Sequence, residues 1–343
     1  MKKKVSQKDI AQKVGVSTAL VSYVLNNLKE GRISKVVAQK IRDTATELNY
    51  RTNQIARSLK TNKTFTIGLI VADISNPFFS TLARIIEDEA AKENYTVIFG
   101  SSDENAQKSW KLINALADRQ VDGLIIAPAE NSEATLTYLS EHDIPFVLID
   151  RYFPGLETNW VCIDNYKAAY TAVQHLIAGG NKRTGMITYN STLYNLNERK
   201  RGYIDALVDH NIIFDKHWCR EISTGDMAKG VENALDDLLS SPGRIDSILF
   251  ASNILATAGL KYIYSLGIKV PDDLAIVSFD QADTSDLFYA PLTYLKQPVQ
   301  EMGEIATGIL LKNIGKREEK THQVNLEAAL VIRHSTLPVS GVQ

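Results

Sequence analysis

The chain has 343 residues, of which 44% are hydrophobic and 23% are charged, and its formal net charge is −2. This is too long for one typical hydrophobic core, so we expect a globular protein of two or three domains. No apolar run reaches the roughly 18 residues of a membrane span, and the opening MKKK is followed by polar VSQKDIAQKVG rather than by the apolar stretch of a signal peptide, so a cytoplasmic protein is expected.

Two short helices are predicted at the start of the chain, where residues 7 to 27 read QKDIAQKVGVSTALVSYVLNN. Residues 9–14 have the pattern of one helix, and Gly15 suits a tight turn because it has no side chain. Ser17 can cap a second helix that ends near Asn26. Such a pair forms either an ordinary helical hairpin or a helix-turn-helix.

The distribution of charge favours the helix-turn-helix. Residues 1–63 contain 14 Lys and Arg against 4 Asp and Glu, a net charge of +10, which leaves −12 on residues 64–343. A basic module on an acidic body is typical of proteins that bind nucleic acid. The candidates for reading bases lie along the second helix and at its end: Thr18, Ala19, Ser22, Tyr23 and Asn26.

A third helix is expected from Ser34, with Val37, Ile41 and Leu48 on its inner face. The basic segment that follows, YRTNQIARSLKTNK at residues 50–63, has the composition of a flexible linker. Residues 53–59 could instead form two helical turns, but a helix this short needs a partner surface to order it.

From residue 64 onward, apolar runs alternate with amphipathic helices. Runs such as TIGLIVAD (66–73) and PFVLID (145–150) do not alternate with polar residues, so they indicate strands that are covered on both faces. The pattern restarts after residue 160 and predicts two α/β units with parallel sheets, which share crossover strands near the end of the chain. The expected boundaries are 1–50 for the headpiece, 51–63 for the linker, 64–163 plus about 293–321 for the first lobe, and 164–292 plus about 322–338 for the second.

Polar and aromatic side chains follow most of the predicted strands. Because the carboxyl ends of parallel strands meet at one edge, these side chains converge if the two units face each other. The Asp and Asn residues among them are also common as helix caps and turn residues after strands. As a set, carboxylates, an amide, arginines and an aromatic pair suit a neutral polyol. The candidate ligand residues are Asp73, Phe78, Phe79, Asp150, Arg151, Arg199, Asn253, Asp280 and Gln297.

Motifs for catalysis and cofactors are missing from the sequence. It contains no GxSxG, GxGxxG or GxxxxGK[ST], and its six histidines lie outside any metal-ligand spacing. Cys162 and Cys219 are in no CxxC or Cys/His cluster, so we expect no metal site. The sequence allows a disulfide between them, but in a cytosolic protein we expect free buried thiols instead. We therefore predict that the protein is not an enzyme and needs no cofactor, although a hidden carboxylate pair could still do acid–base work.

The chain resembles the lactose/galactose-repressor family of bacterial transcription regulators over nearly its whole length. The resemblance is carried in order by KDIAQKVGVSTALVSYVLN, ELNYRTNQIARSL, IGLIVADISNPFF, VDGLIIAP, IPFVLIDR, VCIDN, RKRGY, ASNILATAGL, VPDDLAIVSFD and PLTYLKQP. The fold that it implies is an all-α helix-turn-helix headpiece on an α/β core of two doubly wound parallel-sheet lobes, similar to periplasmic sugar receptors.

The resemblance also implies roles for particular residues. The helix-turn-helix would enter the major groove, and the segment from Asn53 would form a hinge helix in the minor groove, with Leu59 as a wedge between base pairs and Ala56 beside it. Asp150, Arg199, Asn253 and Asp280 match positions that bind ligand hydroxyls in the family. Phe78, Phe79 and Gln297 match further positions in the cleft.

One departure concerns the DNA site. Many members of the family have Arg where this chain has Tyr23, and Arg favours guanine, whereas Tyr23 and Ala19 offer apolar contact. The operator is therefore expected to differ from the common family sequence.

These observations predict a DNA-binding transcriptional regulator, a repressor by resemblance, that senses a sugar or sugar derivative. A homodimer on a palindromic DNA operator is implied, because one headpiece reads only a half-site. The alternatives are a regulator of a nucleobase or phosphorylated metabolite, a solute receptor that does not bind DNA, and a sugar-processing enzyme.

Overall fold

The computed structural model describes residues 5–26, 32–50, 63–223, 225–240, 243–315 and 320–337. The chain divides into two compact units, Met1–Thr64 and Phe65–Gln343. In the described residues, no helix has the length and apolar character needed to cross a membrane.

The first unit, the headpiece, is a three-helix core. Its helices are α1 (Gln7–Val14), α2 (Thr18–Leu25) and α3 (Lys35–Glu47), and its buried hydrophobic side chains are Ile10, Ala11, Val21, Val24, Ile41 and Ala45. Local chemistry sets the helix ends. Gly15 ends α1 with a φ of 79°, and the Ser17 hydroxyl accepts a hydrogen bond of 3.2 Å from the Leu20 amide at the start of α2. The predicted helix-turn-helix is therefore confirmed.

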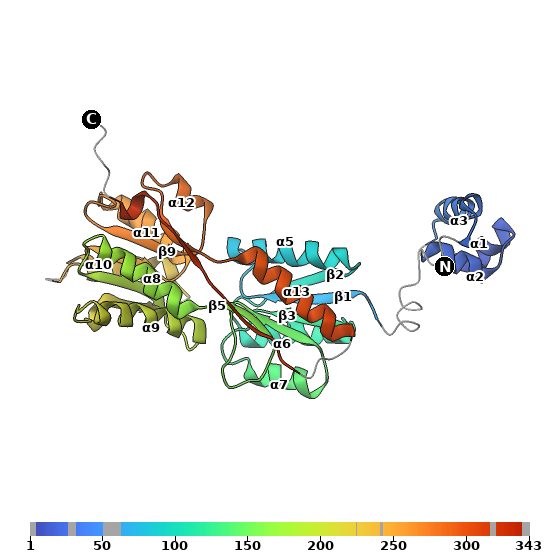
Figure 1. The fold of residues 1–343 in the computed structure, drawn as a ribbon, viewed down its shortest axis with the longest axis horizontal. Coiled ribbons are helices and arrows are strands. Elements are labelled where there is room, and N and C mark those ends of the chain that lie inside the picture. The colour runs from blue at the N-terminus through green and yellow to red at the C-terminus, as the bar shows by residue number, and fades with distance from the viewer. Residues whose placement is uncertain are drawn as a thin grey trace. The chain divides into compact units, whose positions relative to one another are not determined.

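The second unit contains two parallel sheets flanked by helices (Figure 1). The first sheet has the order β11-β5-β4-β3-β1-β2, and all its neighbouring strands are parallel. Its strands are β1 (Thr66–Val71), β2 (Thr96–Ser101), β3 (Gly123–Ile126), β4 (Phe146–Ile149), β5 (Trp160–Ile163) and β11 (Gln323–Leu326). With α5 (Pro77–Lys92), α6 (Ala106–Asp118), α7 (Glu133–Glu141) and α13 (Val299–Gly315) it forms the first lobe.

The second sheet has the order β12-β10-β9-β8-β6-β7 and is parallel except for the last strand, β12. Its strands are β6 (Thr184–Tyr189), β7 (Cys219–Ile222), β8 (Ser247–Phe250), β9 (Ala275–Phe279), β10 (Thr293–Lys296) and β12 (Ala329–Val331). The helices of this second lobe are α8 (Asn165–Ala178), α9 (Tyr194–Asp209), α10 (Met227–Ser240), α11 (Asn253–Ser265) and the short α12 (Asp283–Leu287). The predicted pair of doubly wound parallel-sheet lobes is confirmed.

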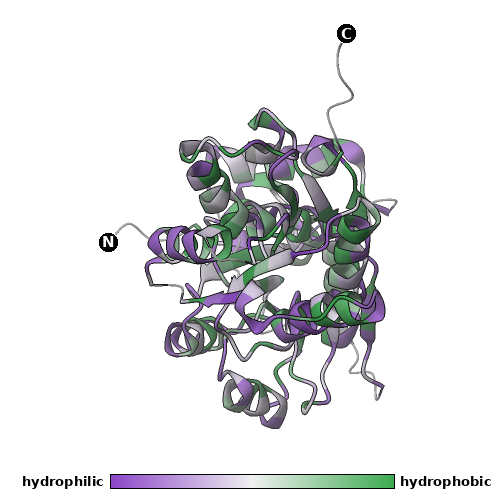
Figure 2. Cartoon of the chain, turned by 90° about the vertical axis from the view of Figure 1, so that its left-hand side faces the viewer, coloured by the Kyte–Doolittle hydropathy of each residue, from purple (hydrophilic) through white to green (hydrophobic). Residues whose placement is uncertain are grey.

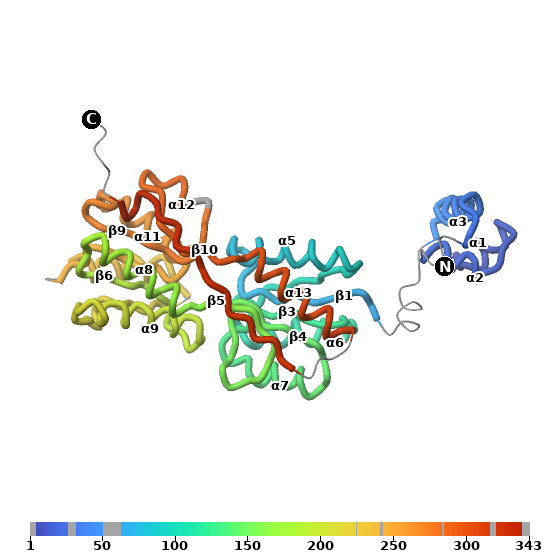
Figure 3. The backbone as a smooth tube through the Cα atoms, viewed as in Figure 1, coloured from blue at the N-terminus to red at the C-terminus, as the bar shows by residue number. Residues whose placement is uncertain are grey.

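The crossover segments differ from the boundaries expected from sequence. β10 was expected in the first lobe but pairs with β9 in the second, and β11 was expected in the second lobe but pairs with β5 in the first. The chain therefore changes lobe after β5, after β10 and again after β11, and Figure 3 shows its last segment passing between the lobes. These strands are only three or four residues long, so their own pattern does not choose a sheet, and the neighbouring strand decides the pairing.

The central strands are hydrophobic because helices cover both of their faces. All residues of β3, β4, β5, β8 and β9 are buried, whereas helices present hydrophilic residues outward (Figure 2). Cys162 and Cys219 are free thiols, as expected, and burial raises the pKa of both.

Candidate ligand-binding cleft

A cavity of about 460 Å³ lies between the two lobes, at the edge where the strands end. It is lined by eight of the nine ligand residues predicted from the sequence: Asp73, Phe78, Phe79, Asp150, Arg151, Arg199, Asp280 and Gln297. Loops that follow β1 and β4 in the first lobe, and β9 and β10 in the second, supply most of them. The expected convergence of strand-end residues is thus observed.

Asp150 and Asp280 occupy equivalent places in the two lobes. Each directly follows a central strand, each has a φ of 67°, and each donates its backbone N–H at 3.0 Å to a strand of its own sheet, at Val161 and Leu295. A left-handed conformation is uncommon for residues other than glycine, and the strain is typical of functional sites. Burial raises the pKa of both carboxyl groups, because the cleft removes them from water.

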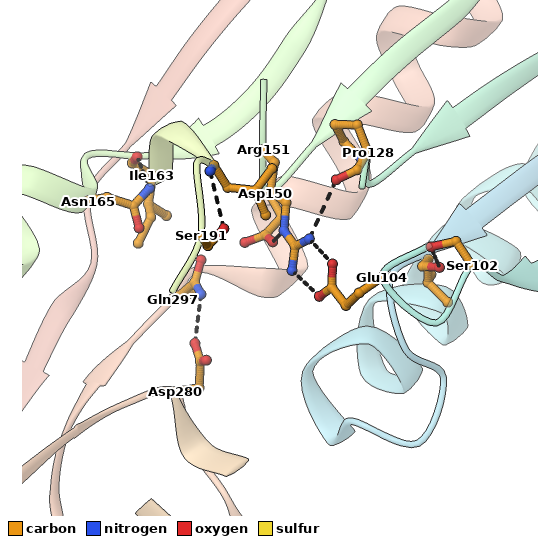
Figure 4. Close-up of polar contacts among 12 residues, drawn as sticks. Ser102, Glu104, Pro128, Asp150, Arg151, Ile163, Asn165, Ser191, Asp280 and Gln297 are labelled. Carbon is orange, nitrogen blue, oxygen red and sulfur yellow. Dashed lines mark hydrogen bonds and ion pairs between the residues drawn. The ribbon is translucent and has the colours of Figure 1, made fainter. Parts of the chain in front are cut away.

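The Arg151 guanidinium is held by two carboxylates. It donates to Glu104 Oε2 at 2.6 Å and to Oε1 at 2.7 Å, and its Nε donates to Asp150 Oδ2 at 3.2 Å (Figure 4). Its contact with the Pro128 carbonyl is longer, at 3.4 Å. Burial lowers the pKa of Arg151, but the charges of Glu104 and Asp150 raise it more, so the guanidinium stays cationic.

Arg199 is 3% exposed and is fixed from three directions. Its Nε donates to Asn165 Oδ1 at 2.7 Å, its Nη1 donates to the Ala251 carbonyl at 2.6 Å, and its guanidinium carbon lies 3.9 Å from the centre of the Phe279 ring. Burial lowers the pKa of Arg199, and the negative charges of Asp280 and Asp150 oppose that effect. The arginine is therefore a rigid donor between two carboxylates.

Three amide oxygens in and beside the cleft are buried without a hydrogen-bond partner in the described residues: those of Asn195, Asn253 and Gln297. Gln297 donates through Nε2 to Asp280 Oδ1 at 2.6 Å (Figure 4), and this bond fixes which end of the amide carries the oxygen. Unpaired buried acceptors are costly, so these oxygens suit a ligand that donates hydrogen bonds.

Asn253 is the one predicted ligand residue that does not line this cavity. Its Nδ2 donates to Asn76 Oδ1 at 3.1 Å, which joins the second lobe to the first. Its side chain borders a neighbouring groove between α10 and α11. Here the asparagine links the lobes rather than facing the main cavity.

Sequence reasoning missed several lining residues, among them Glu104, Glu130, Tyr189 and Asn195. Glu104 follows β2, and the same strand-end rule that found Asp73 and Asp150 would have found it. Asn195 lies within the first turn of α9, one turn before Arg199, and no strand end marks it.

In the headpiece, the outer face of α2 carries the predicted base-reading residues. Thr18 and Ala19 are exposed, and Ser22 and Tyr23 are half-buried. Asn26 follows the helix, and its Nδ2 donates to the Ser22 carbonyl at 2.7 Å. The predicted hinge residues Asn53, Ala56 and Leu59 lie outside the described residues.

Comparisons with known proteins cover both units. Residues 6–53 match a model of bacterial regulatory proteins of the lacI family, and residues 64–334 match a model of periplasmic binding proteins and the sugar binding domain of the LacI family. The HTH-type transcriptional repressor PurR of Aliivibrio fischeri (strain MJ11) is 30% identical, over 96% of this chain and 98% of its own. The ribose operon repressor of Halalkalibacterium halodurans is 32% identical, over 96% of both chains. A solved structure of a LacI family transcriptional regulator from Enterococcus faecium with bound ribose has 27% identity and a TM-score of 0.71, over 80% of this chain and 100% of its own.

Proposed function

The chain belongs to the LacI family of bacterial regulatory proteins, and on that premise we propose that it is a transcriptional repressor that senses a sugar or sugar derivative between its two lobes. It is a DNA-binding transcriptional regulator and not an enzyme.

The observation that carries the sugar proposal is the convergence of Asp150, Arg199, Asp280 and the Phe78–Phe79 pair on one cavity. Carboxylates accept hydrogen bonds from hydroxyl groups, and a fixed guanidinium donates to a hydroxyl or ring oxygen. The rings of Phe78 and Phe79, whose centres are 5.0 Å apart, offer apolar surface to the C–H face of a sugar. A relative that is named a ribose operon repressor supports the same class of effector.

The DNA partner is a double-stranded operator. We place the base-reading contacts on Thr18, Ala19, Ser22, Tyr23 and Asn26 in the headpiece of residues 1–50, with residues 51–63 as the hinge that contains Asn53, Ala56 and Leu59. Two headpieces of a homodimer would read a palindromic site, since one recognition helix reads a half-site. A DNA-binding regulator of this kind acts in the cytoplasm.

The test is an operator-binding assay with candidate effectors. The duplex is selected from a random pool with the full-length protein, and its affinity is measured by fluorescence anisotropy with and without ribose, other pentoses, hexoses and nucleobases. We expect one of the sugars to change operator affinity about 5- to 150-fold, the range of a coupling free energy of about 1–3 kcal/mol.

If only a nucleobase changed the operator affinity, the effector would be a nucleobase rather than a sugar. The role as a DNA-binding regulator would be unaffected. Failure to enrich any duplex would overturn the DNA-binding role itself.

A further inference from the structure

The cleft is strongly acidic for a site that contains two arginines. Its lining includes six carboxylates and two guanidiniums: Asp73, Asp103, Glu104, Glu130, Asp150 and Asp280 against Arg151 and Arg199. Asp103 is also paired with Lys108, outside the lining, so five carboxylates remain against the two arginines. Like charges repel more strongly where water is excluded, so this excess acts against any anionic group that enters the cavity.

Both arginines are already engaged by the protein. Glu104 faces Arg151 with two parallel N–H···O hydrogen bonds of 2.6 and 2.7 Å, which is the geometry that a guanidinium uses to bind a phosphate or a sugar carboxylate. Arg199 donates to Asn165 and Ala251 and lies over the Phe279 ring. The place on Arg151 that an anionic group of a ligand would take is thus occupied by Glu104.

The backbone holds Glu104 in position for this contact. The residue follows β2 with a φ of 56°, and its N–H donates to the Ala72 carbonyl at 3.1 Å, which ties the loop to the end of β1. The side chain is about one-third exposed at the rim of the cavity, whereas the Arg151 side chain is 10% exposed. Glu104 therefore reaches inward from a fixed loop and covers the more deeply placed guanidinium.

The unsatisfied groups of the cleft point to the same kind of ligand. The Gln297 and Asn195 amide oxygens are buried acceptors without a partner in the described residues, and the Asp150 and Asp280 carboxylates only accept when they are ionised. A ligand rich in hydroxyl groups supplies the missing donors, and a phosphate group, which only accepts when fully ionised, supplies none.

We infer that Glu104 is a specificity-determining residue, which reserves the cleft for polyhydroxyl ligands without a phosphate or carboxylate group by occupying Arg151. This inference rests on the proposed function, since it names the class of effector that the regulator senses. It separates free sugars from phosphorylated sugars, two classes that the family assignment leaves open.

The first test uses the wild-type full-length protein and matched pairs of ligands: D-ribose with D-ribose 5-phosphate, and D-glucose with D-glucose 6-phosphate. Thermal unfolding and isothermal titration calorimetry measure binding to each. We expect an uncharged member to bind at least tenfold more tightly than its phosphorylated partner. Tighter binding of a phosphorylated member, or no binding by any uncharged member, would overturn the inference.

The second test replaces the carboxylate and uses inorganic phosphate as the probe. Glu104→Gln removes the negative charge and one of the two acceptors that face Arg151, so we expect saturable stabilisation by phosphate that the wild type lacks, and a gain of at least tenfold in affinity for D-ribose 5-phosphate. Glu141→Gln is the matched control, because it removes one negative charge at an exposed position at the end of α7. It should bind phosphate no better than the wild type.

The double variant Glu104→Gln/Arg151→Gln shows whether the gain depends on the guanidinium, and we expect phosphate binding to be lost again. Phosphate binding by the wild type, or none by a folded Glu104→Gln protein, would contradict the role of Glu104. Operator binding is measured on the same proteins without ligand. If the proteins bind the operator but do not prefer uncharged sugars, only the inference about Glu104 is wrong. If the wild type does not bind DNA, the proposed function itself is wrong.

Discussion

At the scale of single residues, Arg199 has two tasks that substitution can separate. It compensates the buried carboxylates of Asp150 and Asp280, and it presents a fork of donors that is fixed by Asn165 and Ala251. We predict that Arg199→Ala lowers the free energy of unfolding by about 3–5 kcal/mol, because it leaves buried charge without its partner. Arg199→Lys keeps the charge but loses the fork, so it should cost less stability and still weaken sugar binding at least tenfold.

Urea unfolding and calorimetry with the responding sugar check this prediction. Arg84→Lys is the control, since Arg84 forms an exposed ion pair with Glu87 on α5 and should change stability by less than about 0.5 kcal/mol. Equal stability of Arg199→Ala and the wild type would mean that Arg199 does not compensate the two carboxylates.

How far single residues of the site can be predicted depends on what positions them. Asp150 and Asp280 were found because the end of a parallel strand fixes where the next residue lies. The same rule covers the position of Glu104, which also follows a strand, but its contact with the guanidinium from the loop after β4 is seen only in the structure. Asn253 lies at a strand end as well, but its contact with Asn76 in the opposite lobe is a tertiary relation that no local pattern contains.

At the scale of elements, α8 and α9 approach closely at Gly202. A Cβ atom there would lie 2.2 Å from the Tyr166 carbonyl oxygen and 3.1 Å from the Tyr170 backbone nitrogen. Backbone atoms of a helix cannot move aside cheaply, so we predict that Gly202→Ala destabilises the protein by about 3 kcal/mol. Gly308 in α13 is the control, because a Cβ there meets no atom within 4 Å. Gly308→Ala should be neutral or stabilising by up to about 1 kcal/mol.

Chemical denaturation of the two glycine variants gives the comparison directly. Similar midpoints for both would show that the helices adjust to the extra methyl group, and the close approach would then have no energetic weight.

The elements themselves were predictable to different degrees. Long helices such as α5 and α13 have enough turns for their apolar periodicity to be read. β4 is apolar throughout, and β1 has no charged residue and is buried after Thr66, because helices cover both faces of the sheet. The short strands β10 and β11 were assigned to the wrong lobes. β10 pairs with β9, and β11 pairs with β5, which is far away along the chain. The pairing partner, rather than the composition of the strand, decides to which lobe each strand belongs.

At the scale of the whole core, hydrogen bonds join the two lobes at two places beside the cleft. Asn253 donates to Asn76 at 3.1 Å. The second contact joins Glu130, in the loop after β3, to the loop after β6. Glu130 Oε1 accepts a hydrogen bond of 2.5 Å from the Thr192 N–H and another from the Ser191 hydroxyl. Three crossovers also join the lobes. We therefore expect any closure to pivot about these connections and the contacts of Glu130 to favour the closed arrangement.

We predict that Glu130→Gln shifts the ligand-free core toward an open arrangement and weakens sugar binding severalfold, since a ligand held between the lobes requires closure. Hydrogen bonds to a partly exposed carboxylate contribute roughly 1 kcal/mol. Burial raises the pKa of Glu130, but the hydrogen bonds from Ser191 and Thr192 lower it more, so the net pKa is below its ordinary value. The stabilisation is therefore fully present above about pH 4.3, the usual pKa of glutamate, and is lost as the pH falls through the lower pKa of the folded state.

Small-angle scattering of the core, calorimetry with the responding sugar and a double-mutant cycle with Ser191→Ala test this closure contact. A substitution on either lobe removes part of the same contact, so the two changes should cost less together than the sum of their separate costs. If the two free-energy changes were strictly additive, Glu130 and Ser191 would act independently. If Glu130→Gln left the radius of gyration unchanged, the crossovers and Asn253, rather than Glu130, would hold the lobes together. Coupling with a larger radius would show that the regulator holds its cleft partly closed before the ligand arrives.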